Sequence, residues 1–329
     1  MKKFLFTRVQ ESECVVKFVE DCRKNIPESL LIVDSGVPKF KGKSFPNIYA
    51  LKGGEHVKSL DRVLEMYQLF KVSKKDSVTA VGGGALLDLV GYSTSTYTEL
   101  KHLRLVPSTP LSQVMLPICG SFFINLEFRK DVLRTFGVPE EVIIEPQLSY
   151  EVFSRQGVYE LFPMLITAYS YDWRLFNYLS NLISEGMEID LKLWEDLLWS
   201  SLKAYIDGIS NDYEPVGISM TRILQSAFRL KLDYMVALAF GAIIESWVGL
   251  LHGLLDEEHT RKFFLTLKKI WCNNWPYRLD MSSVTEYIDK LKEIVIWLPG
   301  GAQQRRVVVS STELSRMVRK NMRGLESFT

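Results

Sequence analysis

A β-branched run that ends in three consecutive glycines is the feature that most restricts how this chain can fold. The segment VTAVGGGALLDLVGY, residues 78–92, has the pattern of a buried strand, a glycine turn and an apolar-periodic helix. Glycines at such a turn let backbone amides approach a phosphate group, and the positive end of the following helix points at the same place. Because the pattern is not the usual GxGxxG fingerprint, a tight strand-to-helix turn without a ligand is an equal alternative at this point.

This turn belongs to a regular alternation of β-branched runs and amphipathic stretches that fills the first 150 residues. Examples are SLLIVDSG, FPNIYALKGG, SLDRVLEMYQLF, LRLVPSTPL and EEVIIEP. After Pro146 helical periodicity dominates, apart from a late β-like piece at RRVVVSS. We therefore predict an α/β dinucleotide-binding domain with a largely parallel sheet over residues 1–150, and an all-α domain over residues 151–329.

Composition excludes several classes of protein. Forty basic side chains balance 39 acidic ones, so no overall field would attract nucleic acid or anionic lipid. The four cysteines (Cys14, Cys22, Cys119 and Cys272) lie far apart and indicate free thiols in a reducing compartment. The apolar stretch at the N-terminus is too short for a signal peptide. We expect a cytoplasmic protein that binds neither nucleic acid nor a membrane.

One apolar segment, Met235–Leu255, is nearly long enough to cross a bilayer. Its Glu245 and His252 would be costly in lipid. A helix buried at the centre of the second domain is therefore the better interpretation.

Two further segments flank the glycine turn and give it a context. LKGGEHVKSL lies upstream, with Glu55 and Lys58 three residues apart, and VPSTPLSQV lies downstream, with the adjacent hydroxyls of Ser108 and Thr109. Together the three segments resemble the nucleotide site of 3-dehydroquinate synthases and related sugar-phosphate cyclases. The resemblance is collinear from about residue 30 to about residue 310.

This resemblance implies an NAD site. Asp34 falls where the family has an acidic residue near the adenosine, and a carboxylate there can accept hydrogen bonds from ribose hydroxyls. The implied cofactor-binding residues are Asp34, Glu55, Lys58, Gly82, Gly83, Gly84, Asp88, Ser108, Thr109 and Leu111. Lys52 and Pro110 depart from the family pattern. Alternatively, Asp88 could only stabilise the start of its helix, and Glu55 with Lys58 could be a surface pair.

The catalytic segment of the family is altered in this chain. Where the family has D-S-S-I-G-G-K-T-G-x-N, this sequence reads M-L-P-I-C-G-S-F-F-I-N, so Met115 replaces the acid and Ser121 the lysine. Asn125 is retained, and Lys130 matches the lysine of the family's K-N-L-I-G-A-F. These two are the catalytic residues that the resemblance implies. Two cationic positions for a phosphorylated substrate are lost, because they are occupied by Glu99 and Pro163.

The family's zinc ligands are altered further. Glu160 matches the glutamate, but Ile218 and Arg222 stand at the two histidine positions of GHTFGHAIE. The last ligand falls on Leu232, Asp233 or Tyr234. A catalytic zinc site normally needs three protein ligands, so Glu160 is a vestigial single ligand and we expect zinc to be lost.

The four histidines do not rebuild a metal site elsewhere. A helix break is expected between His252 and His259, and His56 and His102 belong to the other domain.

Three functions remain open. The first is a degenerate 3-dehydroquinate synthase-like protein, related to the shikimate pathway of aromatic amino acid biosynthesis, which binds NAD but lacks ordinary synthase activity. The second is a metal-independent cyclase or dehydrogenase that uses Asn125, Lys130 and Glu160 in new roles. The third is a pseudoenzyme that pairs with an active paralogue. The expected ligands are a nucleotide and a phosphorylated sugar acid, and the expected assembly is a homodimer or a heterodimer.

Overall fold

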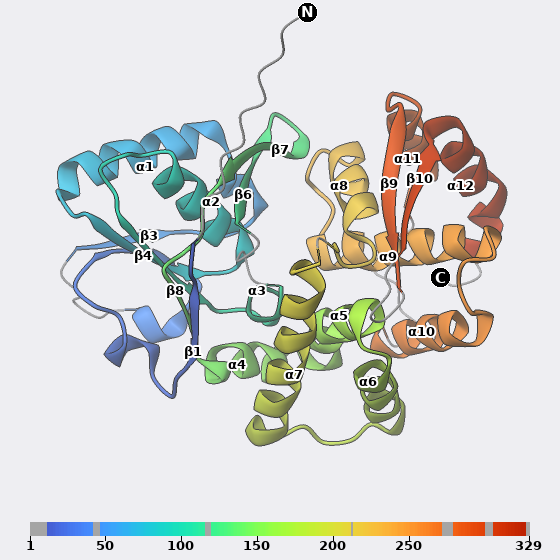
Figure 1. Ribbon diagram of the computed structural model, residues 1–329, viewed down its shortest axis with the longest axis horizontal. Helices are drawn as coiled ribbons and strands as arrows, with labels where there is room; N and C mark the ends of the chain where they lie inside the picture. Colours follow the sequence, from blue (N-terminus) through green and yellow to red (C-terminus); the bar gives the residue numbers. More distant parts are fainter. Residues whose placement is uncertain are drawn as a thin grey trace, which may run out of the picture.

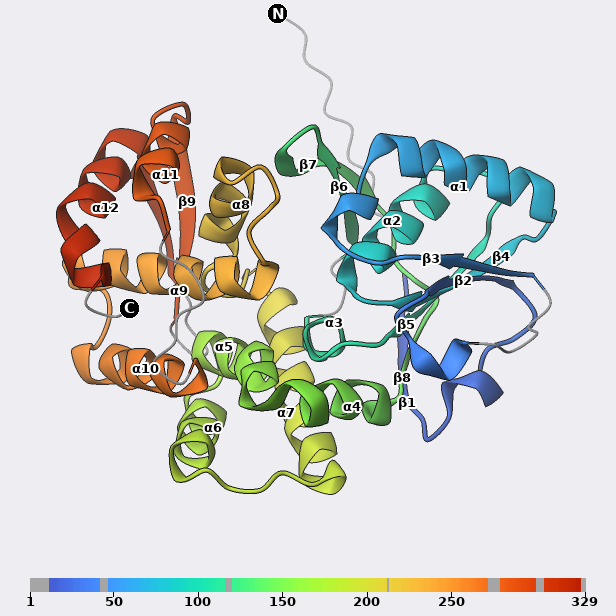
Figure 2. The same ribbon diagram turned by 180° about the vertical axis from the view of Figure 1, so that it is seen from behind.

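The computed structural model describes residues 12–41, 47–115, 120–211, 213–271, 279–299 and 305–326. Cys119 and Cys272 lie outside these ranges, and Cys14 and Cys22 are free thiols. An α/β half and a mainly helical half lie side by side (Figures 1 and 2).

The first half is built on a six-stranded sheet, in which every pairing is parallel and the strand order is β1-β8-β5-β4-β2-β3. The sheet strands are β1 (Val15–Phe18), β2 (Leu30–Asp34), β3 (Ile48–Leu51), β4 (Ser77–Gly82), β5 (His102–Pro107) and β8 (Glu141–Ile144). The connecting helices are η1 (Cys22–Lys24), η2 (Pro38–Phe40), η3 (Glu55–Val57), α1 (Leu60–Ser73), α2 (Gly84–Ser95) and α3 (Pro110–Val114). The predicted parallel α/β layer is confirmed.

The sheet is covered on both faces, which explains why its strands are apolar at successive positions. Side chains alternate along a strand, so Leu30 and Ile32 of β2 join the larger core with α1 and α2. Leu31 and Val33 join a smaller core on the opposite face, with η1 and η2. Strands buried on both faces read as continuous apolar runs, as the sequence of β2 does.

A hairpin not predicted from the sequence stands beside the sheet. Strands β6 (Ser121–Leu126) and β7 (Arg129–Phe136) pair antiparallel around a two-residue turn at Glu127 and Phe128. The register is irregular between Ile124 and Leu126, which places Asn125 in a bulge. Bulges redirect a side chain away from the regular alternation. The hairpin extends toward the helical half (Figure 1).

The second half is mainly helical, as predicted. Its helices are η4 (Gly157–Leu161), α5 (Phe162–Tyr171), α6 (Trp173–Glu185), α7 (Leu191–Ile209), α8 (Ile218–Ala227), α9 (Tyr234–Leu251), α10 (Glu257–Ile270), α11 (Met281–Ile288) and α12 (Ser311–Glu326). The late β-like piece forms β10 (Arg305–Ser310), which pairs antiparallel with β9 (Glu293–Leu298). Strand β9 was not predicted.

Helix α4 (Pro146–Gln156) spans the expected boundary near residue 150, and the division into two domains stays a prediction. The larger core continues across this position. Trp194 of α7 stacks on Phe153 of α4 with ring centroids 4.8 Å apart, and its indole N–H donates to Ser149 Oγ (2.8 Å). These contacts join α4 to the helical half.

Helix α9 lies at the centre of the second half. By length and composition it could cross a membrane, but 78% of its 18-residue window is buried inside the protein. The prediction of a buried central helix is confirmed. The Glu245 carboxylate is fully buried and accepts hydrogen bonds from the backbone N–H groups of Gly217 and Met220, both at 2.8 Å.

The contact between α8 and α9 leaves no room for a side chain at Gly241. A Cβ at this position would lie 2.4 Å from the backbone oxygen of Gly217 and 3.0 Å from Thr221 Oγ1. We expect Gly241→Ala to lower the free energy of unfolding by about 1–3 kcal/mol, measured by urea denaturation. Gly84 is the matched control, because a Cβ there meets nothing within 4 Å. Gly84→Ala should leave stability unchanged or raise it by about 0.4–1 kcal/mol. Equal losses in both variants would contradict the assignment of this crossing.

Glu245 predicts a pH dependence of stability. Burial raises the pKa of this carboxyl to about 8, although the N–H groups of Gly217 and Met220 partly oppose the shift. At intermediate pH the folded state therefore binds a proton that the unfolded state has released, so this contribution to stability is lost as pH rises through about 8. Between about pH 6 and pH 9, wild type should lose more stability than Glu245→Gln, as measured by thermal melts across the range. Parallel curves would refute the assignment.

Candidate functional site

The carboxyl ends of the parallel strands bring the predicted nucleotide residues together. Asp34 ends β2, Gly82 ends β4, and the Ser108 N–H donates to the Gly82 carbonyl oxygen (3.0 Å). The half-buried Asp34 carboxylate accepts from the N–H groups of Gly36 (2.8 Å) and Gly53 (3.2 Å). In parallel α/β sheets, ligands bind outside this edge.

The glycine turn is built as the sequence predicts. Gly83 is the N-cap of α2, and no side chain caps this end of the helix. A Cβ on Gly84 would enter open space. First-turn amides without a side-chain cap suit an anionic group such as a pyrophosphate.

In the third predicted nucleotide segment, VPSTPLSQV, some polar groups are already used to cap helix α3. Thr109 is the N-cap of α3 and forms a capping box with Ser112, so the Thr109 hydroxyl is already hydrogen-bonded. Pro110, which departs from the family pattern, is the first residue of this helix, a position where proline needs no N–H partner. Leu111 packs against the core, and Lys52 is exposed.

Five of the residues predicted from the sequence converge on one group of charges, together with a sixth that was not predicted. We call this group the lysine–carboxylate cluster; it consists of Glu55, Lys58, Asp88, Asn125, Lys130 and Asp131. Lys58 Nζ lies 2.6 Å from Asp88 Oδ2 and 2.6 Å from Asp131 Oδ1. Lys130 Nζ lies 2.6 Å from Glu55 Oε1 and 3.1 Å from Asp131 Oδ1. The alternative of a surface pair between Glu55 and Lys58 is wrong, because the Lys58 side chain is 2% exposed and its ion pairs are with the two aspartates.

Asn125 organises the cluster from its bulge in β6. Its Nδ2 donates to Glu55 Oε1 (2.7 Å), and its Oδ1 accepts from the Asp131 backbone N–H (2.9 Å). Its own backbone N–H donates to the Lys58 carbonyl oxygen (3.0 Å). One amide side chain thus fixes the hairpin against the segment that follows β3.

Asp131 is the member that reasoning from the sequence missed. Its backbone has φ +54°, a left-handed conformation that aspartate tolerates better than most residues. Burial disfavours its charge, but Lys58 and Lys130 hold the pKa of its carboxyl below the usual range. Burial also disfavours the charge of Lys58, but Asp131 and Asp88 hold the pKa of that ammonium well above its ordinary value. The sequence did offer one signal that pointed to Asp131, which is that it directly follows the predicted residue Lys130.

The hairpin also joins the cluster to the helical half. The Lys130 backbone N–H donates to Ser226 Oγ of α8 (2.9 Å), and its Nζ lies 5.3 Å from the ring centroid of Tyr234, at the start of α9. Figures 1 and 2 both show β7 beside α8.

The residues at the predicted metal-ligand positions, Glu160, Ile218, Arg222 and 232–234, include carboxylates but no imidazole. Glu160 is buried in η4, and burial, followed by the charge of Asp233, raises the pKa of its carboxyl to about 7. Asp233 caps α9 and accepts from the Tyr159 hydroxyl (3.0 Å). Ile218 begins α8 and offers only hydrocarbon. These donors do not fit the three-ligand set of a catalytic zinc ion.

Arg222, at the second histidine position, is engaged elsewhere. Its guanidinium makes a two-pronged ion pair with Glu214, at 2.9 and 2.8 Å. At the missing lysine position, Ser121 Oγ instead accepts from Arg134 at 2.9 and 2.6 Å. Met115 is the C-cap of α3. At the two positions where the resemblance predicts an acid and a lysine, this chain thus has a helix-capping methionine and a serine that is held by an arginine.

A second group of possible metal ligands lies in the α/β half. Ligand atoms of Asp21, Cys22 and Glu145 approach within 4.8 Å of one another. Lys39 is ion-paired with both carboxylates, at 2.9 Å from Asp21 Oδ1. The lysine ammonium thus already supplies the cation at this position.

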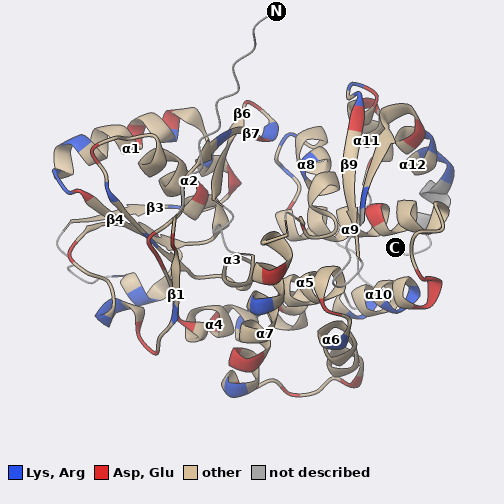
Figure 3. Cartoon of the chain, viewed as in Figure 1, with Lys and Arg blue, Asp and Glu red and all other residues tan. Residues whose placement is uncertain are grey.

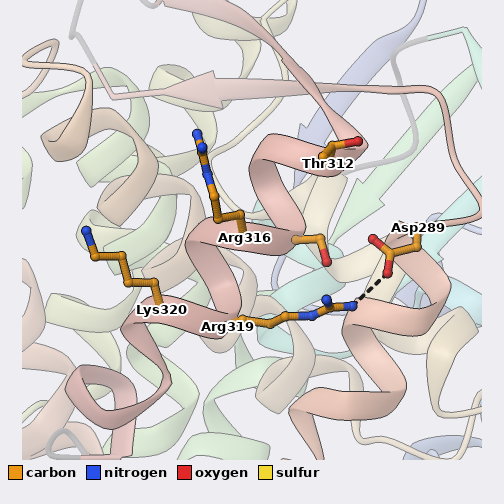
Figure 4. A pocket seen from close by; sticks show the side chains of 6 residues that line it. Asp289, Thr312, Arg316, Arg319 and Lys320 are labelled. Atoms are coloured by element: carbon orange, nitrogen blue, oxygen red, sulfur yellow. Dashed lines mark hydrogen bonds and ion pairs between the residues drawn. The ribbon is translucent and has the colours of Figure 1, made fainter.

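A hollow of about 530 Å³ lies on the C-terminal helices α11 and α12 (Figure 4). It is lined by Asp289, Thr312, Ser315, Arg316, Arg319 and Lys320. Arg319 is ion-paired with Asp289 (2.7 Å), and no lining residue belongs to the predicted site. Elsewhere, acidic and basic positions are interspersed over both halves (Figure 3), as the balanced composition predicts.

Comparison with known proteins supports the family resemblance. Residues 48–156 match the family model described as 3-dehydroquinate synthase N-terminal. A bifunctional shikimate kinase/3-dehydroquinate synthase of Thermotoga maritima is 33% identical over 42% of this chain and 30% of its own length. A 3-dehydroquinate synthase of Alkaliphilus metalliredigens is 24% identical over 73% of each chain. This chain spans less than half of the length of the first two curated relatives, 30% of one and 43% of the other.

Solved structures share the whole fold. A 2-epi-5-epi-valiolone synthase from Streptomyces hygroscopicus, with NAD+ and Zn2+ bound, has a TM-score of 0.78 at 16% identity, over 97% of this chain and 99% of that one. A 2-deoxy-scyllo-inosose synthase complexed with carbaglucose-6-phosphate, NAD+ and Co2+ has a TM-score of 0.75 at 18% identity, over 93% and 96%. Residues 48–156 thus resemble the N-terminal part of 3-dehydroquinate synthases, and the whole chain shares the fold of these solved structures.

Proposed function

We propose that this chain is a 3-dehydroquinate synthase-like protein that binds NAD but has lost the zinc site and the ordinary synthase activity. The observation that carries the proposal is the donor set at the metal position. Glu160 and Asp233 offer carboxylates, but Ile218 offers no donor atom and Arg222 carries a positive charge that repels a cation.

NAD binding is supported by the intact strand edge. Asp34, the glycine turn and the uncapped start of α2 lie together, and Gly84 faces open space. A carboxylate for ribose hydroxyls and helix amides for a pyrophosphate are the elements that a dinucleotide requires. Two of the structural neighbours have NAD+ bound.

Loss of activity is supported by the state of Lys130 as well as by the metal position. Its side chain is 3% exposed, and its ammonium is ion-paired with Glu55 and Asp131. A buried lysine whose ammonium group is held by two carboxylates is poorly placed to act on a substrate. Residues that act as one catalytic unit lose activity together when several are missing.

NAD binding can be tested with two substitutions at Gly84. We expect NAD to raise the melting temperature of wild type and, to a smaller extent, that of Gly84→Ala, because the added methyl group meets no protein atom but enters the space through which the phosphate approaches. Gly84→Asp should fold equally well, since an acid suits the first turn of a helix, but should bind NAD at least tenfold more weakly through repulsion of the pyrophosphate. Isothermal titration measures both affinities. Equal NAD affinity in the two variants would place the nucleotide elsewhere.

Zinc loss can be tested on natively purified protein. We expect native mass spectrometry to find nucleotide but no stoichiometric zinc, and the heptulosonate phosphate substrate of the family's synthases to be turned over no faster than in a protein-free control. One zinc ion per chain together with turnover at ordinary enzyme rates would overturn the proposal.

A metal-independent cyclase or dehydrogenase is the second candidate. It is favoured by the survival of Asn125, Lys130 and Glu160 in an otherwise altered site. Lys130→Met would then abolish a measurable turnover, whereas the first proposal expects no reaction to change. Pairing with an active paralogue and a cytoplasmic location stay predictions.

A further inference from the structure

The charges of the lysine–carboxylate cluster do not balance. Two ammonium groups, from Lys58 and Lys130, face three carboxyl groups, from Glu55, Asp88 and Asp131. The formal sum is +2 −3 = −1. A site with this sum repels a further anion unless one carboxyl group is neutralised or removed.

The acidic side chains of the cluster are also more exposed to solvent than its two lysines. The Lys58 and Lys130 side chains are only 2% and 3% exposed, whereas the carboxyl-bearing side chains of Asp131, Asp88 and Glu55 are 13%, 18% and 21% exposed. A ligand that approaches the cluster therefore meets carboxylate oxygens before it meets ammonium groups.

Asp131 has a special place among the three acids. Asp88 pairs with Lys58 and Glu55 with Lys130, but Asp131 Oδ1 bridges both ammonium groups, at 2.6 and 3.1 Å. Its backbone is held by the Asn125 amide, which keeps the side chain between the two lysines. A single oxygen between two buried ammonium groups is the position that an oxygen of a bound phosphate or carboxylate would otherwise take.

We infer that Asp131 is an internal counter-ion that occupies the anion position between Lys58 and Lys130, and so makes the position between these two lysines reject a phosphate group in favour of an uncharged group. The inference deepens the proposed function and rests on it for the role of the site as a ligand site. It names Asp131 as the residue that sets ligand charge.

The inference leads to a gain of binding on substitution. Asp131→Asn keeps the size of the side chain, and asparagine also tolerates a left-handed backbone. It leaves two buried ammonium groups without their bridging charge, which is unfavourable until an anion replaces it. Inorganic phosphate, added at matched ionic strength, should bind Asp131→Asn at least tenfold more tightly than wild type. Phosphate should also raise the melting temperature of this variant and not that of wild type.

Two controls separate this effect from a general change in charge. Asp207 is exposed on α7, so Asp207→Asn changes the net charge equally but should leave phosphate binding as in wild type. Adding Lys130→Met to Asp131→Asn should remove the gained binding, because one of the two ammonium groups is then missing.

The outcomes are distinguishable from failure of the proposed function. NAD titration of each variant reports on the nucleotide site separately. Phosphate titration of wild type tests the inference without any substitution. Saturable phosphate binding by wild type that Lys130→Met abolishes would overturn the inference, whether or not NAD binds. A folded Asp131→Asn that responds to phosphate no more than Asp207→Asn would overturn it as well.

Discussion

The buried pairing of two lysines with three acids is the interaction on which the arrangement of the site depends. Lys58 follows β3, Asp88 lies on α2, and Lys130 and Asp131 lie on the hairpin, so the ion pairs join three separate segments. Buried ammonium groups are costly unless each has a charged partner. Every member of the cluster therefore constrains the others, and the hairpin that carries Lys130 also contacts α8 through Ser226.

The helical half is organised by a different constraint, the close crossing of α8 and α9. Gly217 and Gly241 allow the two backbones to approach, and the buried Glu245 carboxyl group accepts the N–H groups at the start of α8. The segment that resembles the family's histidine-rich motif is thus retained as a packing element. This segment can keep its packing without metal-binding side chains. Packing of α8 on α9 depends on the close approach of the backbones, whereas metal binding depends on side-chain donor atoms.

The two halves of the candidate site have consequently diverged to different degrees. The nucleotide edge needs backbone amides and one carboxylate, and these survive at Gly83, Gly84 and Asp34. The chemistry of the family needs specific cations and metal ligands, and our proposal is that substitutions have removed them from this chain. A chain of this kind can keep its fold and a cofactor surface while its reaction is lost or changed.

Residue types and their spacing were sufficient to predict the parallel α/β layer, the helical second half, the glycine turn and the buried character of α9. Each of these follows from local periodicity or from residues adjacent along the chain. Through a family resemblance the sequence also predicted Glu55, Lys58, Asp88, Asn125 and Lys130 as site residues. Only the tertiary structure showed that they form one cluster and that Asp131 bridges the two lysines. It also revealed the β6–β7 hairpin and strand β9. These features arise from contacts between residues distant in sequence, or from a backbone geometry that residue types alone do not fix, so no local pattern could have specified them.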